Sequence, residues 1–196
     1  MDGRVKHKIA VFASGNGSNF EAIAAACSSG ELYADVALLV CDKRGAPVIE
    51  RADRFGIPVL VVSPNFFGSK EHYERFILEK LEEHEVELIC LAGYMRIVSD
   101  VLLGAYEGRI INIHPSLLPS FKGAHAIRDA FEYGVKVYGV TVHYVNNEVD
   151  GGRIIMQRGI EYYGKDIEEL EAKIHAIEHK LYVESINMIF RGDNEI

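Results

Sequence analysis

The fold is decided by the stretch Ile110-Ile-Asn-Ile-His-Pro-Ser-Leu-Leu-Pro119, which begins as an apolar, β-branched run and ends in a proline-bounded loop. Such a run predicts a buried strand. Asn112 and His114 are two residues apart, so their side chains point to the same face of that strand. Burying two polar groups among isoleucines is costly unless they have partners or a task. Ligands of open parallel sheets bind beyond the carboxyl ends of the strands, so this pair marks a candidate site.

Outward from this stretch, strand-like and helix-like segments alternate. Strands are predicted at 8–13, 35–41, 57–62, 86–91 and 110–113, and helices at 20–28, 46–55, 69–83, 124–133 and from Asp166 onward. This alternation predicts a doubly wound, parallel α/β sheet with helices on both faces, a three-layer arrangement. Segments 137–145 and 153–162 are expected to pair antiparallel across a loop longer than a two-residue hairpin.

Composition limits the class of protein. The 196 residues are 48% hydrophobic and 26% charged, and no repeat or linker divides them, so we expect one domain over 1–196. A net charge of −8 argues against a sequence-independent nucleic-acid binder. No apolar run approaches the roughly 20 residues of a membrane span. Cys27, Cys41 and Cys90 lack metal-type spacing, which favours buried thiols in a reducing compartment, hence a cytoplasmic location.

A glycine-containing turn, Ser14-Gly-Asn-Gly-Ser-Asn19, separates the first strand from the first helix. Free amide hydrogens at a helix start favour phosphate binding, although a plain tight turn is the alternative. A dinucleotide-binding loop is a weaker reading. Gly15 and Gly17 fit that motif and Asp42 could bind a ribose, but Phe20 stands where close packing needs a third glycine.

Four further features stay open from the residues alone. Ala92-Gly-Tyr-Met-Arg-Ile-Val98 suits a flat aromatic ligand with an acidic tail, or simple burial. Asp150, before two glycines, is either a turn residue or a functional one, depending on whether it lies beside His114. His143 is interpreted as an interior histidine with its hydrogen bonds satisfied. His175 and Glu178 flank the apolar stripe of the last helix, where charged side chains are usually solvated, and they have no role on their own.

Other enzyme classes find little support. The eight histidines form no convincing zinc set, so no metal is expected. A Gly-x-Ser-x-Gly elbow is missing as well, which counts against a serine hydrolase.

Together the motifs carry a resemblance to a known family. They are Ser14–Asn19, Leu91-Ala-Gly-Tyr-Met-Arg96, Asn112-Ile-His-Pro-Ser-Leu-Leu-Pro119 and Val142-His-Tyr-Val-Asn-Asn-Glu-Val-Asp-Gly-Gly152. Over about residues 8–190 the sequence resembles the folate-dependent formyltransferases. The third motif is typical of that family in general. The loop Ser14–Asn19 narrows the resemblance to members that act on glycinamide ribonucleotide.

The resemblance implies a seven-stranded, mostly parallel sheet with a late antiparallel strand. It implies formyl transfer from 10-formyltetrahydrofolate to the amine of glycinamide ribonucleotide in purine biosynthesis. It implies small-molecule partners only, with neither nucleic acid nor membrane, and it leaves a homodimer open. The implied catalytic residues are Asn112, His114 and Asp150. The implied phosphoribosyl-binding residues are Gly17, Ser18, Asn19 and Glu178. The implied folate-binding residues are Lys70, Met95, Arg96, Ile97, Val98, Asn112, Asn146, Asn147, Glu148, Val149 and Asp150.

The chemistry of these residue types agrees with that reaction. Asn112 and a protonated His114 can each donate a hydrogen bond to the oxygen that becomes negative when an amine attacks a formyl carbon. A nearby Asp150 carboxylate favours the charged imidazole. This scheme needs neither a covalent intermediate nor a metal.

Four alternatives remain. Methionyl-tRNA formyltransferase carries an additional C-terminal domain and formyltetrahydrofolate deformylase an N-terminal one, and neither domain is expected here. A non-enzymatic nucleotide- or folate-binding module would bind both ligands without turnover. A nicotinamide-dependent oxidoreductase is limited by Phe20. The isomer of the Leu118–Pro119 bond is left undecided.

Overall fold

The computed structural model describes residues 6–192. Its strands follow the order β3-β2-β1-β4-β5-β6-β7 in one seven-stranded sheet. Strand β6 is antiparallel to both β5 and β7, whereas the pairs β1–β2, β2–β3 and β1–β4 are parallel. The predicted mostly parallel α/β sheet with a late antiparallel strand is therefore confirmed. The chain divides into two compact units, residues 1–110 and 111–196, which are described in turn. Assignment of the chain to one domain stays a prediction.

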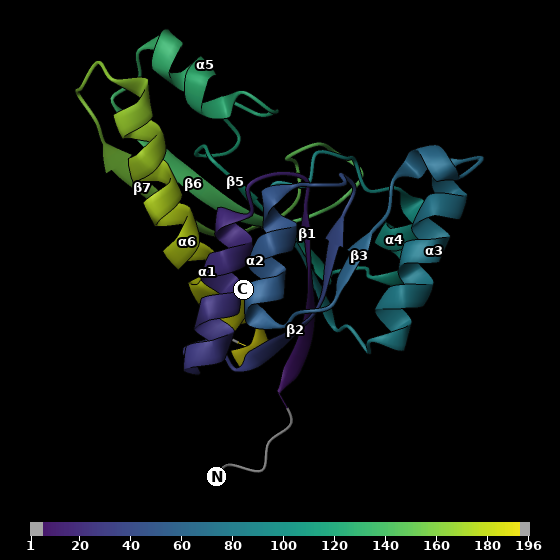
Figure 1. The fold of residues 1–196 in the computed structure, drawn as a ribbon. Coiled ribbons are helices and arrows are strands. Elements are labelled where there is room, and N and C mark those ends of the chain that lie inside the picture. Colours follow the sequence, from purple (N-terminus) through teal and green to yellow (C-terminus); the bar gives the residue numbers. More distant parts are fainter. Residues whose placement is uncertain (1–5, 193–196) are drawn as a thin grey trace. The chain divides into compact units, whose positions relative to one another are not determined.

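The first unit alternates strands and helices. Its elements are β1 (His7–Ala13), α1 (Ser18–Ser29), β2 (Ala34–Cys41), α2 (Pro47–Phe55), β3 (Val59–Val61), the 3-10 helix η1 (Pro64–Phe66), α3 (Lys70–Glu83), β4 (Leu88–Leu91) and α4 (Asp100–Ala105). Helices α1 and α2 contact each other and β2, and α3 contacts α4 (Figure 1). The sequence pattern missed α4 and η1, because elements of six and three residues are too short to show a helical period.

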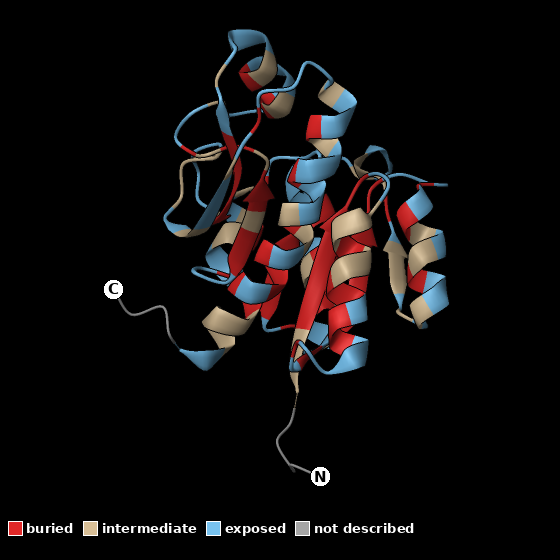
Figure 2. Cartoon of the chain, turned by 90° about the vertical axis from the view of Figure 1, so that its left-hand side faces the viewer, coloured by how far each residue is buried: buried red, intermediate tan, exposed pale blue. Residues whose placement is uncertain are grey.

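Strand β1 is at the centre of this unit's core. Five consecutive residues, from Ile9 to Ala13, are fully buried, so both faces of the strand are covered (Figure 2). Continuous apolar burial is what a parallel strand between two helix layers requires. Cys27, Cys41 and Cys90 are buried with free thiols.

The helix ends follow the local signals of the sequence. Pro47 occupies the first turn of α2, where its missing N–H costs nothing. The Ser69 hydroxyl accepts from the His72 N–H and caps α3. Gly30 adopts a left-handed conformation after α1.

The second unit begins within β5 (Ile110–His114) and continues with α5 (Ala126–Tyr133), β6 (Val137–Tyr144), β7 (Ile154–Glu161) and α6 (Ile167–Arg191). Helix α6 packs against β6 and β7, and α5 contacts α6 (Figure 1). The Tyr182 hydroxyl of α6 donates to the Ile111 carbonyl over 3.2 Å, which ties the helix to β5.

A buried threonine fixes the loop that follows β5. The Thr141 hydroxyl donates to the Ser116 carbonyl (2.7 Å) and accepts from the Leu118 N–H (3.1 Å) and the Gln157 amide (2.9 Å). Thr141 pairs with His114 across the β5–β6 ladder, so this network holds the backbone immediately beyond His114. The Leu118–Pro119 bond within the loop is cis.

Among residues 6–192, no helix combines the length and the apolar character needed to cross a membrane.

The start of α6 yields a prediction about stability. The Asp166 carboxylate accepts from the N–H groups of Glu168 and Glu169. Asp166→Ala should lower the free energy of unfolding by about 1 kcal/mol, whereas Asp166→Asn, which keeps an acceptor, should lose much less. Urea unfolding measures both. Equal losses in the two variants would contradict the capping role.

Candidate active site

Polar side chains gather where β5 ends. Asn112 lies opposite His143 in the β5–β6 ladder. The Asn112 amide nitrogen donates to Nε2 of His143 over 3.2 Å, and Nδ1 of His143 lies 2.8 Å from the Tyr144 carbonyl oxygen. A carbonyl only accepts, so Nδ1 carries the proton and leaves Nε2 as the acceptor for Asn112. The amide therefore keeps a second N–H to donate elsewhere.

His114 is anchored in the same way, through its other nitrogen. Its Nε2 lies 2.8 Å from the Phe121 carbonyl oxygen and must donate to it. Nδ1 then faces Asp150, with 3.5 Å between Nδ1 and Oδ2. His114 is buried, and because the Phe121 carbonyl occupies Nε2, Nδ1 is the ring nitrogen that faces the carboxylate.

Asp150 is held ionised although its side chain is only 11% exposed. Oδ2 accepts from the Gly123 N–H (2.9 Å), and Oδ1 lies 3.7 Å from Nε2 of His143. The His143 imidazole lowers the pKa of Asp150 most strongly, and Gly123 and His114 lower it further, to about 2, against the opposing effect of burial. The carboxylate therefore faces both histidines with its full charge at neutral pH.

The backbone around Asp150 explains the two glycines that follow it. Asp150 itself has a left-handed φ of 49°. A Cβ atom on Gly152 would lie 1.7 Å from the Tyr144 carbonyl oxygen, and one on Gly151 would overlap the Glu148 side chain. The tight turn thus places Asp150 beside His114. The interpretation of Asp150 as a functional residue depended on this placement.

Sequence reasoning missed the segment that follows the Leu118–Pro119 bond. The Phe121 carbonyl binds His114, the Gly123 N–H binds Asp150, and Lys122 forms an ion pair of 2.8 Å with Glu148. A backbone donor and a backbone acceptor carry no side-chain signal, so no residue pattern could have indicated them. His143 is buried with both ring nitrogens hydrogen-bonded, which confirms its interpretation as an interior histidine. Polar residues two apart on an apolar strand were a signal, but only the strand register shows that His143 meets Asn112.

The loop between β6 and β7 contains the predicted folate-contacting residues Asn146, Asn147, Glu148 and Val149, directly before Asp150. The Glu148 N–H donates to the Asn146 side chain over 2.9 Å, and the Val149 side chain is exposed.

Glu178, on α6, differs from the expectation drawn from its flanking position. The sequence pattern indicated a solvated side chain, but Glu178 is buried and lies 2.6 Å from Nδ1 of His175. The pairing raises the pKa of His175. The correction has a physical reason, since a charged partner one helical turn away lets a carboxylate be buried.

In the first unit, Gly17, Ser18 and Asn19 form the start of α1. Gly17 has a left-handed φ of 78°, and an added Cβ would lie 2.3 Å from a methyl carbon of Val48. The first-turn amide hydrogens of an α-helix are free of helical partners and suit an anion. Oδ1 of Asn19 is buried without a hydrogen-bond partner in the part of the chain that the structure describes.

The structure argues against the hypothesis of a dinucleotide-binding loop, in which Asp42 would bind a ribose. The Asp42 carboxylate accepts from Nε of Arg96 over 2.6 Å and is buried, so it is not free for a ribose. Phe20 is fully buried and fills the position where that motif needs glycine.

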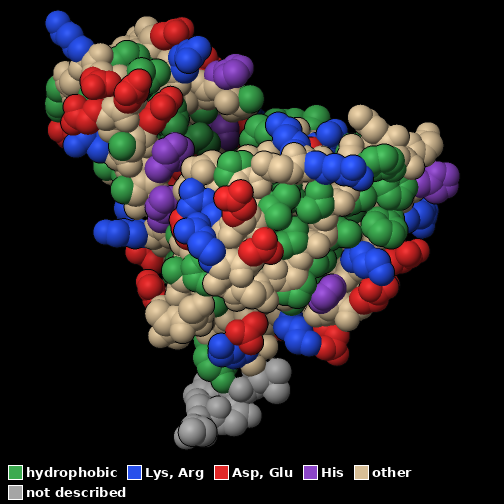
Figure 3. Space-filling view, in the orientation of Figure 1, with side chains coloured by type: hydrophobic (Ala, Val, Ile, Leu, Met, Phe, Trp, Pro, Cys, Tyr) green, Lys and Arg blue, Asp and Glu red, His purple; other side chains and the backbone are tan. Residues whose placement is uncertain are grey.

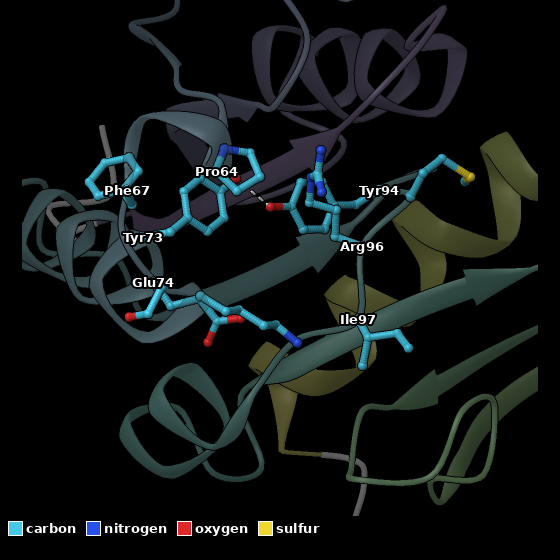
Figure 4. A pocket seen from close by; sticks show the side chains of 10 residues that line it. Pro64, Phe67, Tyr73, Glu74, Tyr94, Arg96 and Ile97 are labelled. Carbon is cyan, nitrogen blue, oxygen red and sulfur yellow. Dashed lines mark hydrogen bonds between the residues drawn. The ribbon is translucent and has the colours of Figure 1, made fainter.

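Four of the predicted folate-binding residues line one pocket of about 390 Å³, namely Lys70, Met95, Arg96 and Ile97. Tyr73, Tyr94 and Glu74 also line it (Figure 4). Val98 is buried and is not part of the lining. On the face shown in Figure 3, hydrophobic side chains gather over β3 and α3 with basic side chains beside them. This mixed surface suits an aromatic ligand that carries acidic groups.

Within residues 6–192, no group of three or more His, Cys, Asp or Glu side chains is arranged to hold a metal ion.

Known proteins are similar to this chain in sequence and in fold. Residues 7–186 match the family model described as formyl transferase. The phosphoribosylglycinamide formyltransferase of Bacillus subtilis (strain 168) is 53% identical over 188 residues, which are 95% of this chain and 96% of that protein. The trifunctional purine biosynthetic protein adenosine-3 of Gallus gallus is 41% identical over 95% of this chain, which spans 19% of that protein. The crystal structure of glycinamide ribonucleotide transformylase 1 from Geobacillus kaustophilus superposes with a TM-score of 0.91 at 50% identity, covering 94% of this chain and 99% of that one.

The close approach of Gly17 to Val48 predicts a local requirement for glycine. Gly17→Ala should lower the free energy of unfolding by about 2 kcal/mol or more, because the new methyl group overlaps Val48 and the left-handed φ disfavours alanine. Gly15→Ala is the matched control, since a Cβ there meets nothing within 4 Å. Chemical denaturation compares the two, and equal stability would show that the helix start relaxes freely.

The lowered pKa of Asp150 predicts a pH dependence of stability. The folded-state value of about 2 lies below the ordinary 3.8, so the contribution is present above about pH 4 and is lost as the pH falls toward 2. Its size is about 2 kcal/mol. Unfolding free energies of the wild type and Asp150→Asn, measured at intervals from pH 5 to 2, should converge over that window. A constant difference between the two proteins would refute the assignment.

Proposed function

We propose that this chain, which belongs to the formyl transferase family, transfers the formyl group of 10-formyltetrahydrofolate to the amine of glycinamide ribonucleotide, a step of purine biosynthesis. The observation that carries the proposal is the cluster of Asn112, His114 and Asp150 in a chain that is similar to formyltransferases along nearly its whole length. Both substrates are small molecules, and the three buried thiols fit a cytoplasmic location.

The reaction needs an electrophile, a nucleophile and one proton transfer. The amine lone pair attacks the formyl carbon, a C–N bond forms, and the carbonyl oxygen becomes an oxyanion. The bond between that carbon and the folate nitrogen then breaks, while the proton lost by the amine passes to the departing nitrogen. The tetrahedral intermediate is the species whose charge the protein must stabilise.

His114 is assigned the charged hydrogen-bond donor and the proton carrier. Its Nε2 is occupied by the Phe121 carbonyl, so the acting atom is Nδ1. The ionised Asp150 carboxylate lies 3.5 Å from that nitrogen and can accept a hydrogen bond from Nδ1–H. Nδ1–H can donate to the oxyanion, pass its proton to the leaving nitrogen as the C–N bond breaks, and then take up the proton lost by the amine.

Asn112 is assigned the second donor to the oxyanion. One of its amide hydrogens is bound by His143, and the other stays available. The anchored amide needs no reorientation during the reaction, which is the condition for effective stabilisation of a developing charge.

The remaining assignments concern binding. Gly17, Ser18 and Asn19 bind the phosphate of the nucleotide at the start of α1, and Glu178 binds the ribose hydroxyls. The folate is bound by Lys70, Met95, Arg96, Ile97 and Val98 and by the loop from Asn146 to Asp150. The shared pocket of the first four of these supports the folate assignment.

The decisive experiment follows release of deformylated folate by absorbance, with and without glycinamide ribonucleotide. Release that requires the nucleotide and yields the formylated amine supports the proposal. Release without the nucleotide would indicate a deformylase. Binding of both ligands without turnover would indicate a binding module.

The assignment of His114 predicts a large kinetic defect. His114→Ala should reduce kcat at least about 100-fold, the cost of losing an oxyanion donor, with little change in nucleotide binding. His84→Ala, at the end of α3, is the control and should leave kcat unchanged. Asp150→Asn should also depress turnover while preserving nucleotide affinity. Near-normal turnover of His114→Ala would remove that residue from the mechanism.

A further inference from the structure

A buried carboxylate in the first unit has no place in the scheme above. Asp42 directly follows β2, and its side chain is 1% exposed. Oδ2 accepts from Nε of Arg96, whereas Oδ1 is buried without a hydrogen-bond partner within residues 6–192. Leaving half of a buried carboxylate unsatisfied is unfavourable, and an apolar residue of similar volume is often tolerated as well or better at such a position. Stability alone therefore does not explain Asp42.

What Asp42 does accomplish is to fix Arg96. The Arg96 side chain is 40% exposed and lines the pocket. Its Nε is held by Asp42, and its two terminal nitrogens make no hydrogen bond or ion pair within the described part of the chain. A guanidinium held at Nε keeps its outer edge free, and that planar pair of nitrogens matches a carboxylate.

The pocket offers a further directed donor next to Arg96. The hydroxyl oxygens of Tyr73 and Tyr94 are 2.7 Å apart and face each other (Figure 4). One hydrogen bond between two hydroxyls uses only one of their hydrogens, so one O–H stays available to an acceptor. Burial raises the pKa of both tyrosines, which keeps them protonated.

Net charge does not make this pocket attractive to an anion. The positive charges of Lys70 and Arg96 are balanced by the negative charges of Asp42 and Glu74. The Glu74 carboxylate is occupied by Ser99, which donates to it from its N–H (2.9 Å) and its hydroxyl. Affinity for a carboxylate must then come from donors held in the right direction, and the direction of Arg96 is set by Asp42.

We propose that Asp42 is a positioning residue that orients the Arg96 guanidinium toward a carboxylate of the folate's glutamate tail. The inference rests on the proposed function, because it takes the pocket as the place where that tail binds.

Two substitutions separate orientation from charge. Asp42→Leu removes the acceptor for Nε, and Asp42→Asn removes the charge but keeps an acceptor. Orientation predicts that Asp42→Leu raises the KM for the formyl donor about 2- to 10-fold with kcat unchanged, since the binding step must now immobilise a free arginine. Asp42→Asn should recover most of the loss. If only the negative charge of Asp42 mattered, both variants would make the pocket more positive. Both should then lower the KM for the formyl donor.

The ligand carboxylate is tested with a donor whose two glutamate carboxylates are carboxamides. With this donor, Asp42→Leu and the wild type should have equal KM values. In an Arg96→Gln background, Asp42→Leu should add no further change. Thermal unfolding verifies that each variant is folded. A KM that falls or stays constant in Asp42→Leu, an equal rise with the carboxamide donor, or an undiminished effect without Arg96 would each overturn the proposal.

A calorimetric measurement keeps this test independent of turnover. The dissociation constant of tetrahydrofolate should rise about 2- to 10-fold in Asp42→Leu, and that of its diamide should not change. If the wild type shows no formyl transfer but this difference in binding persists, the proposed function fails and the role of Asp42 stands. If transfer is normal and the difference is absent, only the role of Asp42 fails.

Discussion

Asp150 stays ionised although its side chain is only 11% exposed, and this depends on neighbours from three separate stretches of residues 111–196. His114 comes from β5, Gly123 from the loop beyond it and His143 from β6. A charge enclosed in the protein is tolerated only when it is paired, so the Asp150 carboxylate requires these neighbours. The cis bond in the β5 loop, the Thr141 network and the two glycines after Asp150 all lie in segments that bring these donors together.

The first unit uses a buried carboxylate for a related purpose. Asp42 fixes a cation whose outer edge faces a pocket, and Asp150 faces the free nitrogen of the His114 ring. In both places the acidic side chain lies one residue or more beyond regular structure and acts through a basic partner. Direct formyl transfer fits this arrangement, because it asks the protein for oriented donors and one proton carrier and for no covalent nucleophile.

Much of this could be read from the residues in order. The alternation of strands and helices, the start of α2 at Pro47 and the cap of α3 by Ser69 are set by local backbone chemistry. The motif residues Asn112 and His114 were identifiable because polar groups on an apolar strand are costly and share one face. The sequence pattern did not predict the short helix α4 or the burial of Glu178, because neither produces a periodic signal.

The sequence by itself determined the class of fold, the order of its elements and which side chains carry chemistry, because these depend on local propensity and on spacing along the chain. Only the tertiary structure decided which nitrogen of His114 is free, that His143 holds Asn112, and that Asp42 binds Arg96 rather than a ligand. Those facts depend on strand register and on backbone groups contributed by loops. Register and loop contacts join residues distant in sequence, so no local pattern contains them.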